Sequence, residues 1–269
     1  MKPINQIILF RTFTYQKLEI MKVALFVPCY IDLIYPEVAI ATLELLEKYN
    51  IEVIVPLNQT CCGQPTANEG DQENSAKIEK AFAENFQDLD VDYIVGPAGS
   101  CVKQIRQHFD AIPQTEKVTA MRAKTIELVQ FFTDVLKITD FSNISFPHTI
   151  AIHNSCSSIR GLHITSRSEW MEPRYNKTEE LLNSIKDITI KHIDRPDECC
   201  GFGGTFCVTD EAVSAKMGQD KVSDYVRNGI EYVVSPDMSC LMHQKGVSDK
   251  EKTNLKFLHV AQILNNGPF

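Results

Sequence analysis

The chain has 269 residues, of which 43% are hydrophobic and 23% are charged, and its formal net charge is −8 at pH 7. This length allows one large domain or two smaller ones, each with a substantial core. The acidic balance argues against binding to nucleic acid or to an anionic membrane, because both partners require a basic surface. Since no apolar run approaches the roughly 20 residues of a membrane span, and the short run 7–10 is no secretory signal, we expect a cytoplasmic protein.

Strand and helix patterns alternate along the first half of the chain. Short apolar runs typical of buried strands occur at 23–27, 51–55 and 91–95. Between the first two, Pro36 opens an amphipathic helical pattern. A polar helix is predicted at 74–87, and a further helix at 123–135.

The second half repeats this order. Strands are predicted at 149–152, 188–193 and 232–234. Alternation of strands and helices implies parallel sheets with right-handed crossovers. We therefore predict an α/β fold of two similar cysteine-rich lobes, each a small, mainly parallel sheet flanked by helices, related by a pseudo-twofold axis. The lobes are expected at 21–139 and 148–269, with a linker at 140–147 and an extension outside the fold at 1–20.

Eight of the nine cysteines form a pattern that occurs twice. Each half has an adjacent pair followed by glycine, with one cysteine upstream and one downstream: Cys29, Cys61, Cys62 and Cys101, then Cys156, Cys199, Cys200 and Cys240. Corresponding cysteines of the two sets are separated by nearly constant lengths of chain. In a reducing compartment, such thiols indicate metal or redox chemistry rather than a disulfide framework.

Every cysteine of this pattern follows a predicted strand. Ligands gather outside the carboxyl ends of the strands of a parallel sheet, so each sheet edge is expected to collect four thiols. Adjacent cysteines reach one centre only from an irregular turn, because successive side chains diverge on a helix or strand. Gly63 and Gly201 permit such a turn, and backbone N–H groups there can hydrogen-bond to cluster sulfurs.

These residues resemble the CCG cysteine-rich domain found in heterodisulfide reductase and in the iron–sulfur subunit of glycolate oxidase. The resemblance is closer still to the lactate utilization A proteins. It covers residues 21–269 and rests on these segments: FVPCY at 26–30, CCGQP at 61–65, SC at 155–156, EPR at 172–174 and CCGFGGTF at 199–206. It implies a cytoplasmic iron–sulfur electron-transfer subunit. That subunit would act with a LutB-like ferredoxin-type iron–sulfur protein and a LutC-like subunit to oxidise L-lactate to pyruvate.

The resemblance also implies a ligand set. The first four cysteines would serve one centre and the second four another, giving one or two [4Fe–4S] clusters per chain. The five-cysteine form of the domain ends each half in C-x-x-C, whereas Gln104 and His243 stand at the final positions here. His243 is therefore a further candidate ligand. The departure also leaves open a degenerate first site, or zinc in one lobe.

Other interpretations of the thiols stay open from sequence alone. They are buried structural thiols, a non-catalytic scaffold stabilised by zinc, and a thiol–disulfide reductase subunit. The iron–sulfur subunit of a glycolate or other 2-hydroxy-acid oxidase is a fourth. It is disfavoured because the chain lacks a ferredoxin-type C-x₂-C-x₂-C-x₃-C run.

Two residues near the pattern receive structural interpretations. Cys207 is predicted to be a buried thiol, and His153 a polar strand end rather than a donor to the site. There is also no dinucleotide fingerprint or phosphate loop. The two-electron chemistry therefore belongs to another subunit, or lactate's hydroxyl meets a cluster iron acting as a Lewis acid. The sequence does not separate these two.

Overall fold

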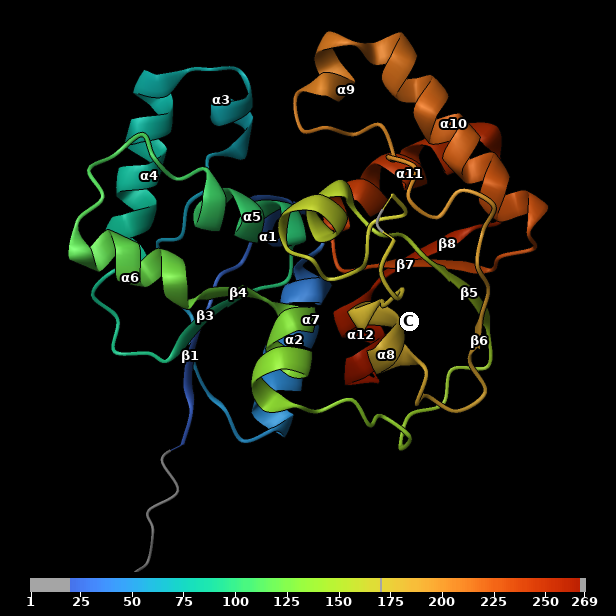
Figure 1. Cartoon of the computed structure of the whole chain (residues 1–269), viewed down its shortest axis with the longest axis horizontal. Helices are drawn as coiled ribbons and strands as arrows, with labels where there is room; N and C mark the ends of the chain where they lie inside the picture. Colours follow the sequence, from blue (N-terminus) through green and yellow to red (C-terminus); the bar gives the residue numbers. More distant parts are fainter. Residues whose placement is uncertain (1–19, 170, 267–269) are drawn as a thin grey trace, which may run out of the picture.

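The computed structural model describes residues 20–169 and 171–266, and shows two four-stranded parallel sheets flanked by helices (Figure 1). The predicted α/β class is thereby confirmed. The proposed extension, apart from Ile20, lies outside the described residues. Within the described ranges, no helix combines the length and apolarity needed to cross a membrane.

The first sheet has the strand order β2-β1-β3-β4. Its strands are β1 (Lys22–Leu25), β2 (Glu52–Ile54), β3 (Tyr93–Gly96) and β4 (Thr125–Glu127). Val23 and Leu25 of β1 pack in one core cluster with residues of α2 (Pro36–Lys48). Ala24 faces a second cluster, which includes residues of α4 (Gln72–Phe86) and α6 (Glu116–Lys124). The continuous apolar run of β1 therefore reflects burial on both faces of the sheet.

The second sheet repeats this arrangement, with the order β6-β5-β7-β8. Its strands are β5 (Thr149–Ile152), β6 (Thr189–Ile190), β7 (Tyr232–Ser235) and β8 (Lys256–His259). Ala151 and Val233 pack on one face with Tyr225 of α10 (Glu211–Arg227), while Ile150 and Ile152 face the opposite cluster. Two lobes of the same topology are thus present, as predicted.

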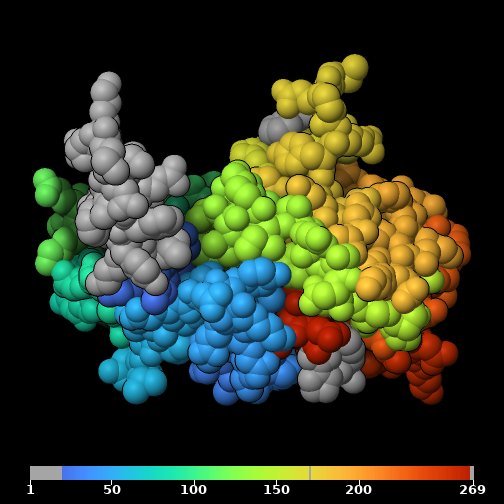
Figure 2. Space-filling model, turned by 90° about the horizontal axis from the view of Figure 1, so that it is seen from below, coloured from blue at the N-terminus to red at the C-terminus, as the bar shows by residue number. Residues whose placement is uncertain are grey.

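The largest core cluster takes residues from both halves of the chain. The short helix α12 (Val260–Asn265), near the carboxyl end, packs against α2 of the first half, and Lys48 donates from Nζ to the Oδ1 of Asn265 at 2.6 Å. Figure 2 shows this segment, in red, between the blue and green parts of the chain. The hydrophobic core is therefore continuous between the lobes and marks no boundary between them. The boundaries at 21–139 and 148–269 stay a prediction.

The segment 140–147 is part of this core. Phe141, Ile144 and Phe146 are each at most 2% exposed, and a parallel bridge joins Ser145 to Lys186 of the second half. The connection between the lobes therefore packs into the protein rather than spanning solvent.

Equivalent residues of the two lobes meet at the centre of the molecule. Ala98 and Asp237 are the N-caps of α5 (Gly99–Gln107) and α11 (Met238–Glu251), and they form an antiparallel bridge with each other. A contact between the same position of two similar units is the kind that a twofold relation produces.

The predicted helix at 123–135 is only partly correct. This segment contains the end of α6, the strand β4, the short helix α7 (Leu128–Gln130) and most of a π-helix, η1 (Phe131–Leu136). The sequence also did not predict β8. The strands β4 and β8 are each the fourth of their sheet. They contain polar residues, so a search for short apolar runs does not find them. The remaining elements are α1 (Cys29–Ile34), α3 (Gln64–Asn68), η2 (Ser157–Gly161), α8 (Lys177–Leu182) and α9 (Phe206–Thr209).

Candidate metal centres

The eight cysteines lie beyond the carboxyl ends of the strands. In the first lobe, Cys29 begins α1 after β1, the pair Cys61–Cys62 lies in the loop between β2 and α3, and Cys101 is in the first turn of α5 after β3. In the second lobe, Cys156 caps η2 after β5, Cys199 and Cys200 lie between β6 and α9, and Cys240 is in the first turn of α11. All nine cysteines are free thiols.

The structure brings the four thiols of the first lobe together. The Sγ atoms of Cys29 and Cys61 are 3.8 Å apart. Cys61 also accepts a hydrogen bond from the Cys62 thiol, and the Cys62 thiol is within hydrogen-bonding reach of Cys101. Cys62 and Cys101 are buried, whereas Cys29 and Cys61 are half-buried. The four sulfurs thus form one continuous group, partly open to solvent.

The electrostatics of this group stabilise negative charge on one sulfur. Hydrogen bonds from Cys29 and Cys62 lower the pKa of Cys61 to about 3. The pKa of Cys29 is raised because its thiol donates to Cys61, and that of Cys62 because its thiol bonds to Cys101 and Cys61 and is buried. Cysteine binds metals as the thiolate, so the geometry favours the ligand form of Cys61.

The second lobe repeats the same order of contacts. The Cys156 thiol donates to Cys199, which raises the pKa of Cys156. Cys199 contacts Cys200, and Cys200 in turn contacts Cys240. The predicted ligands therefore form two four-thiol groups at equivalent positions of the two sheets.

Both adjacent-cysteine loops contain a glycine in the left-handed region. The φ angles of Gly63 and Gly201 are 85° and 92°, which costs a residue with a side chain about 1–2 kcal/mol. At Gly201 an added Cβ would also lie 2.6 Å from the carbonyl oxygen of Ser214. This geometry turns backbone N–H groups toward sulfur. Gly63 donates to Cys61 at 3.4 Å, Gly201 to Cys199 at 3.5 Å and Phe202 to Cys200 at 3.5 Å.

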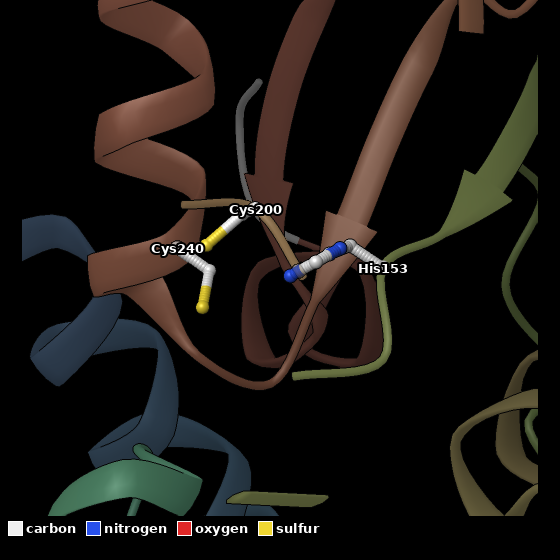
Figure 3. Close-up of side chains that lie close together, drawn as sticks. All are labelled: His153, Cys200 and Cys240. Atoms are coloured by element: carbon white, nitrogen blue, oxygen red, sulfur yellow. The ribbon is translucent and has the colours of Figure 1, made fainter. Parts of the chain in front are cut away.

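His153 belongs to the second-lobe site, although its place in the sequence favoured a polar strand end over a donor to the site. Its side chain is 1% exposed, and its ring extends toward the sulfurs of Cys200 and Cys240 (Figure 3). One ring nitrogen and these two sulfurs all lie within 4.8 Å of one another. The signal in the sequence was a polar residue directly after a buried strand and three positions before Cys156.

His243, the other candidate ligand, is placed differently. It is half-buried on α11, and its Nε2 lies 3.5 Å from the Oγ and 3.4 Å from the carbonyl oxygen of Ser214. Its ring packs near that of Phe202, with centroids 6.0 Å apart. It is not part of the group formed by His153, Cys200 and Cys240. Through Ser214, whose Oγ donates to the carbonyl oxygen of Gly201 at 2.8 Å, His243 packs against the Gly201 loop.

The other residues singled out from the sequence stand outside the two thiol groups. Cys207 is partly buried, and its thiol donates to the carbonyl oxygen of Gly204 at 3.3 Å. Gln104 is buried and donates to the carbonyl oxygen of His108 at 3.1 Å. Trp170 lies outside the described residues. Arg174 lines a cavity of about 630 Å³ at the carboxyl ends of β5 and β6, together with Asn154 and His192.

Comparison with known proteins agrees with this geometry. The chain matches the family described as CCG, cysteine-rich domain, twice, over residues 23–106 and 150–245. It is 40% identical over 249 residues to lactate utilization protein A of an Exiguobacterium species, covering 91% of this chain and 97% of that protein. The chain belongs to the lactate utilization protein A family of CCG cysteine-rich proteins. A further member, from Bacillus thuringiensis, is 34% identical over 250 residues, which are 91% of this chain and 99% of that protein.

The architecture also recurs in a solved structure. A hypothetical protein from Helicobacter pylori aligns with a TM-score of 0.58 at 13% identity, over 92% of this chain and 49% of that one. At this identity the likeness concerns the fold alone.

The residues of this lactate utilization A family member fit an iron–sulfur group. Each lobe supplies four thiols, the number that binds a [4Fe–4S] cluster. Backbone N–H groups donate to sulfurs of the Cys61–Cys62 and Cys199–Cys200 pairs, and such hydrogen bonds tune the reduction potential of a cluster. The buried Nε2 of His153 has no hydrogen-bond partner among the described residues. That orphaned atom indicates that the second-lobe site accommodates a further group.

Proposed function

We propose that this chain is the cytoplasmic iron–sulfur electron-transfer subunit of a multi-component L-lactate dehydrogenase, which converts lactate to pyruvate. The observation that carries this proposal is the presence of two equivalent four-thiol groups, one per lobe. The name shared by its relatives, lactate utilization protein A, supplies the substrate. The partners in this proposal are a LutB-like ferredoxin-type iron–sulfur protein and a LutC-like subunit.

The residues of each lobe have defined tasks in this proposal. Cys29, Cys61, Cys62 and Cys101 hold the first centre, and Cys156, Cys199, Cys200 and Cys240 hold the second. Two one-electron centres would together accept the two electrons that oxidation of one lactate releases. Cys62, Cys101, Cys200 and Cys240 are buried and so keep water from the inner side of each centre, while Cys29 and Cys156 are nearer to solvent and to a docking partner.

The decisive experiment measures what the thiols bind. Iron, zinc and acid-labile sulfide are determined on anaerobically purified protein, with EPR spectra before and after dithionite. Two [4Fe–4S] centres would give about eight iron and eight sulfide per chain. Addition of L-lactate together with both partner proteins should then produce the reduced signal, whereas D-lactate or omission of a partner should not.

Zinc without sulfide would refute the electron-transfer role and favour the zinc-stabilised scaffold, because zinc has no redox chemistry. Iron and sulfide with a signal that dithionite produces but lactate and partners do not would instead refute the substrate. Glycolate in place of lactate then tests the related 2-hydroxy-acid oxidase.

A further inference from the structure

We propose that His153 donates an N–H···S hydrogen bond from Nε2 to the second-lobe centre and thereby raises its reduction potential above that of the first-lobe centre. This inference rests on the proposed function, because it requires an iron–sulfur group in each lobe. It assigns a direction to electron flow within the chain, from the first lobe to the second.

The residue that directly follows the central strand differs chemically between the two lobes. The residue after β1 is Phe26, and the residue after β5 is His153. The N–H of Phe26 donates to Val95 at 2.9 Å, and that of His153 donates to Val234 at 2.7 Å. Val95 and Val234 occupy the same place in their sheets, since each pairs with the last residue of the neighbouring strand. Phe26 and His153 are therefore counterparts.

Their surroundings show what this exchange does. Phe26 packs edge-on against Phe82 and Phe86, with ring centroids 5.1 and 6.0 Å away, in an apolar cluster that includes Cys62 and Cys101. In the second lobe an imidazole takes this place beside Cys200 and Cys240. One lobe thus offers its thiols an aromatic ring without a donor, and the other offers a ring with two nitrogen atoms.

The Nε2 atom of His153 needs a partner that the thiols' bound group would provide. It is buried and has no hydrogen-bond partner among residues 20–169 and 171–266. A buried polar atom without a partner costs about 1–3 kcal/mol. The ring extends from the end of β5 toward the two sulfurs, which come from the loop before α9 and from α11 (Figure 3). A cluster or thiolate sulfur there would remove this cost.

The other ring nitrogen fixes which hydrogen-bonding role Nε2 takes. Nδ1 lies 3.4 Å from the hydroxyl of Tyr225, a fully buried residue of α10. Among the described residues, Nδ1 of His153 is the acceptor available to the Tyr225 hydroxyl. If the tyrosine donates to Nδ1, the proton of a neutral imidazole is on Nε2. The atom facing the sulfurs is then a donor, and the lobe's four thiols leave no cluster iron in need of a nitrogen ligand.

Hydrogen bonds to cluster sulfurs raise the reduction potential, because they stabilise the more negative reduced state. Backbone N–H groups reach sulfur in both lobes, so they do not distinguish the centres in kind. The contact of His153 with the sulfurs does distinguish the two centres, because the side chain of Phe26 has no hydrogen-bond donor. An electron shared between the lobes is therefore expected to favour the second.

The test replaces His153 by its first-lobe counterpart, His153→Phe, in the full-length protein with both centres loaded. Redox titration followed by EPR should show the higher of the two potentials falling by about 59 mV, which is a tenfold change in a one-electron equilibrium constant. Iron, sulfide and the lower potential should stay unchanged. Tyr225→Phe, which frees the Nε2 proton to move to Nδ1, should shift the same potential in the same direction by less.

His148→Phe is the matched control. This histidine is on the same lobe, but its Nδ1 lies 2.7 Å from a carboxyl oxygen of Glu231 and not beside the thiols, so its loss should leave both potentials in place. Equal potentials in wild type and His153→Phe, with both centres intact, would overturn the proposal. If His153→Phe loses iron, His153→Gln is measured instead, because glutamine keeps an N–H donor. Retained iron and a retained high potential support donation, whereas lost iron identifies His153 as a ligand and overturns it.

Two results separate this inference from the proposed function. Strong nitrogen hyperfine coupling in pulsed EPR would show direct coordination, which overturns the hydrogen-bond role while leaving an iron–sulfur subunit. Wild-type protein that holds zinc and no sulfide would remove the proposed function, and this inference with it.

Discussion

Glu127 is expected to make the stability of the protein fall as the pH rises. This carboxyl group is wholly buried at the end of β4. Its Oε2 accepts hydrogen bonds from the N–H groups of Val129, at 2.7 Å, and Gln130, at 3.2 Å, whereas Oε1 has no hydrogen-bond partner among the described residues. Burial raises its pKa from the usual 4.5 to about 8. The folded protein therefore holds this carboxyl in its neutral form.

The size and sign of the effect follow from linkage between protonation and folding. Below pH 4.5 the carboxyl is protonated in both states, so it contributes no pH dependence. Between 4.5 and about 8 the unfolded chain loses the proton and the folded protein keeps it, which lowers the free energy of unfolding as the pH rises. At 1.36 kcal/mol per pKa unit, the full loss approaches about 5 kcal/mol above pH 8.

Glu127→Gln removes this titration but keeps an oxygen to cap α7. The variant should match wild type near pH 5 and exceed it increasingly up to pH 8. At about 2–4 °C per kcal/mol for a protein of this size, the gain in Tm approaches about 10–20 °C, measured by scanning calorimetry at several pH values. Gln130→Met is the control, because it removes a neighbouring buried hydrogen bond (2.8 Å, to Leu162) without a titrating group. Parallel Tm curves for Glu127→Gln and wild type from pH 5 to 8 would refute the reasoning.

Three further predictions concern the ligands, the loop and the shared core. Cys200→Ser should lower bound iron substantially while Cys207→Ser leaves it unchanged, because only the first thiol joins the four-sulfur group; equal losses would contradict the ligand assignment. Gly201→Ala should reduce both iron content and Tm more than Gly70→Ala, since both have positive φ but only the first Cβ meets backbone, at 2.6 Å; equal effects would show that backbone strain alone matters. Asn265→Ala should cost about 0.5–1.5 kcal/mol of unfolding free energy by urea titration, because it removes side-chain hydrogen bonds to Lys48 and Glu44 of α2 while Lys48 keeps the backbone carbonyl of residue 265 as an acceptor. An unchanged midpoint would show that these side-chain contacts are not needed.

The convergence of the cysteines was predictable because it depends on local signals. A run such as the one over β1 marks a strand buried on both faces, and the cysteines follow such runs at short distances. Parallel strands bring their carboxyl ends to one edge whatever the details of packing. The thiol groups therefore follow from topology, which a repeated strand–helix pattern specifies.

The fourth strands were not predictable from the same signals. Glu127 and His259 end β4 and β8 at equivalent registers, opposite Gly96 and Ser235. Each is buried and caps the helix that follows it. In sequence such polar residues indicate a loop or a helix surface, because their partners are backbone groups that only the folded chain supplies. The same reason hid the role of His153, whose partners come from distant segments.

The repeat duplicated the thiols but not what surrounds them. Where the first lobe has Phe26 and Ala98, the second has His153 and Asp237. Asp237 accepts hydrogen bonds from the N–H and Oγ of Ser100, at 2.8 and 3.2 Å, across the boundary between the lobes. Its burial raises its pKa, so the second lobe adds a carboxyl group that is costly to charge at the point where equivalent residues of the lobes meet. Hydrogen bonds and burial set the reduction potential of a cluster, so equal ligand sets in these unequal surroundings would hold clusters of different potential. Under the proposed electron-transfer function, two centres in unequal surroundings would differ in reduction potential, and this difference would give electrons a preferred direction through the chain.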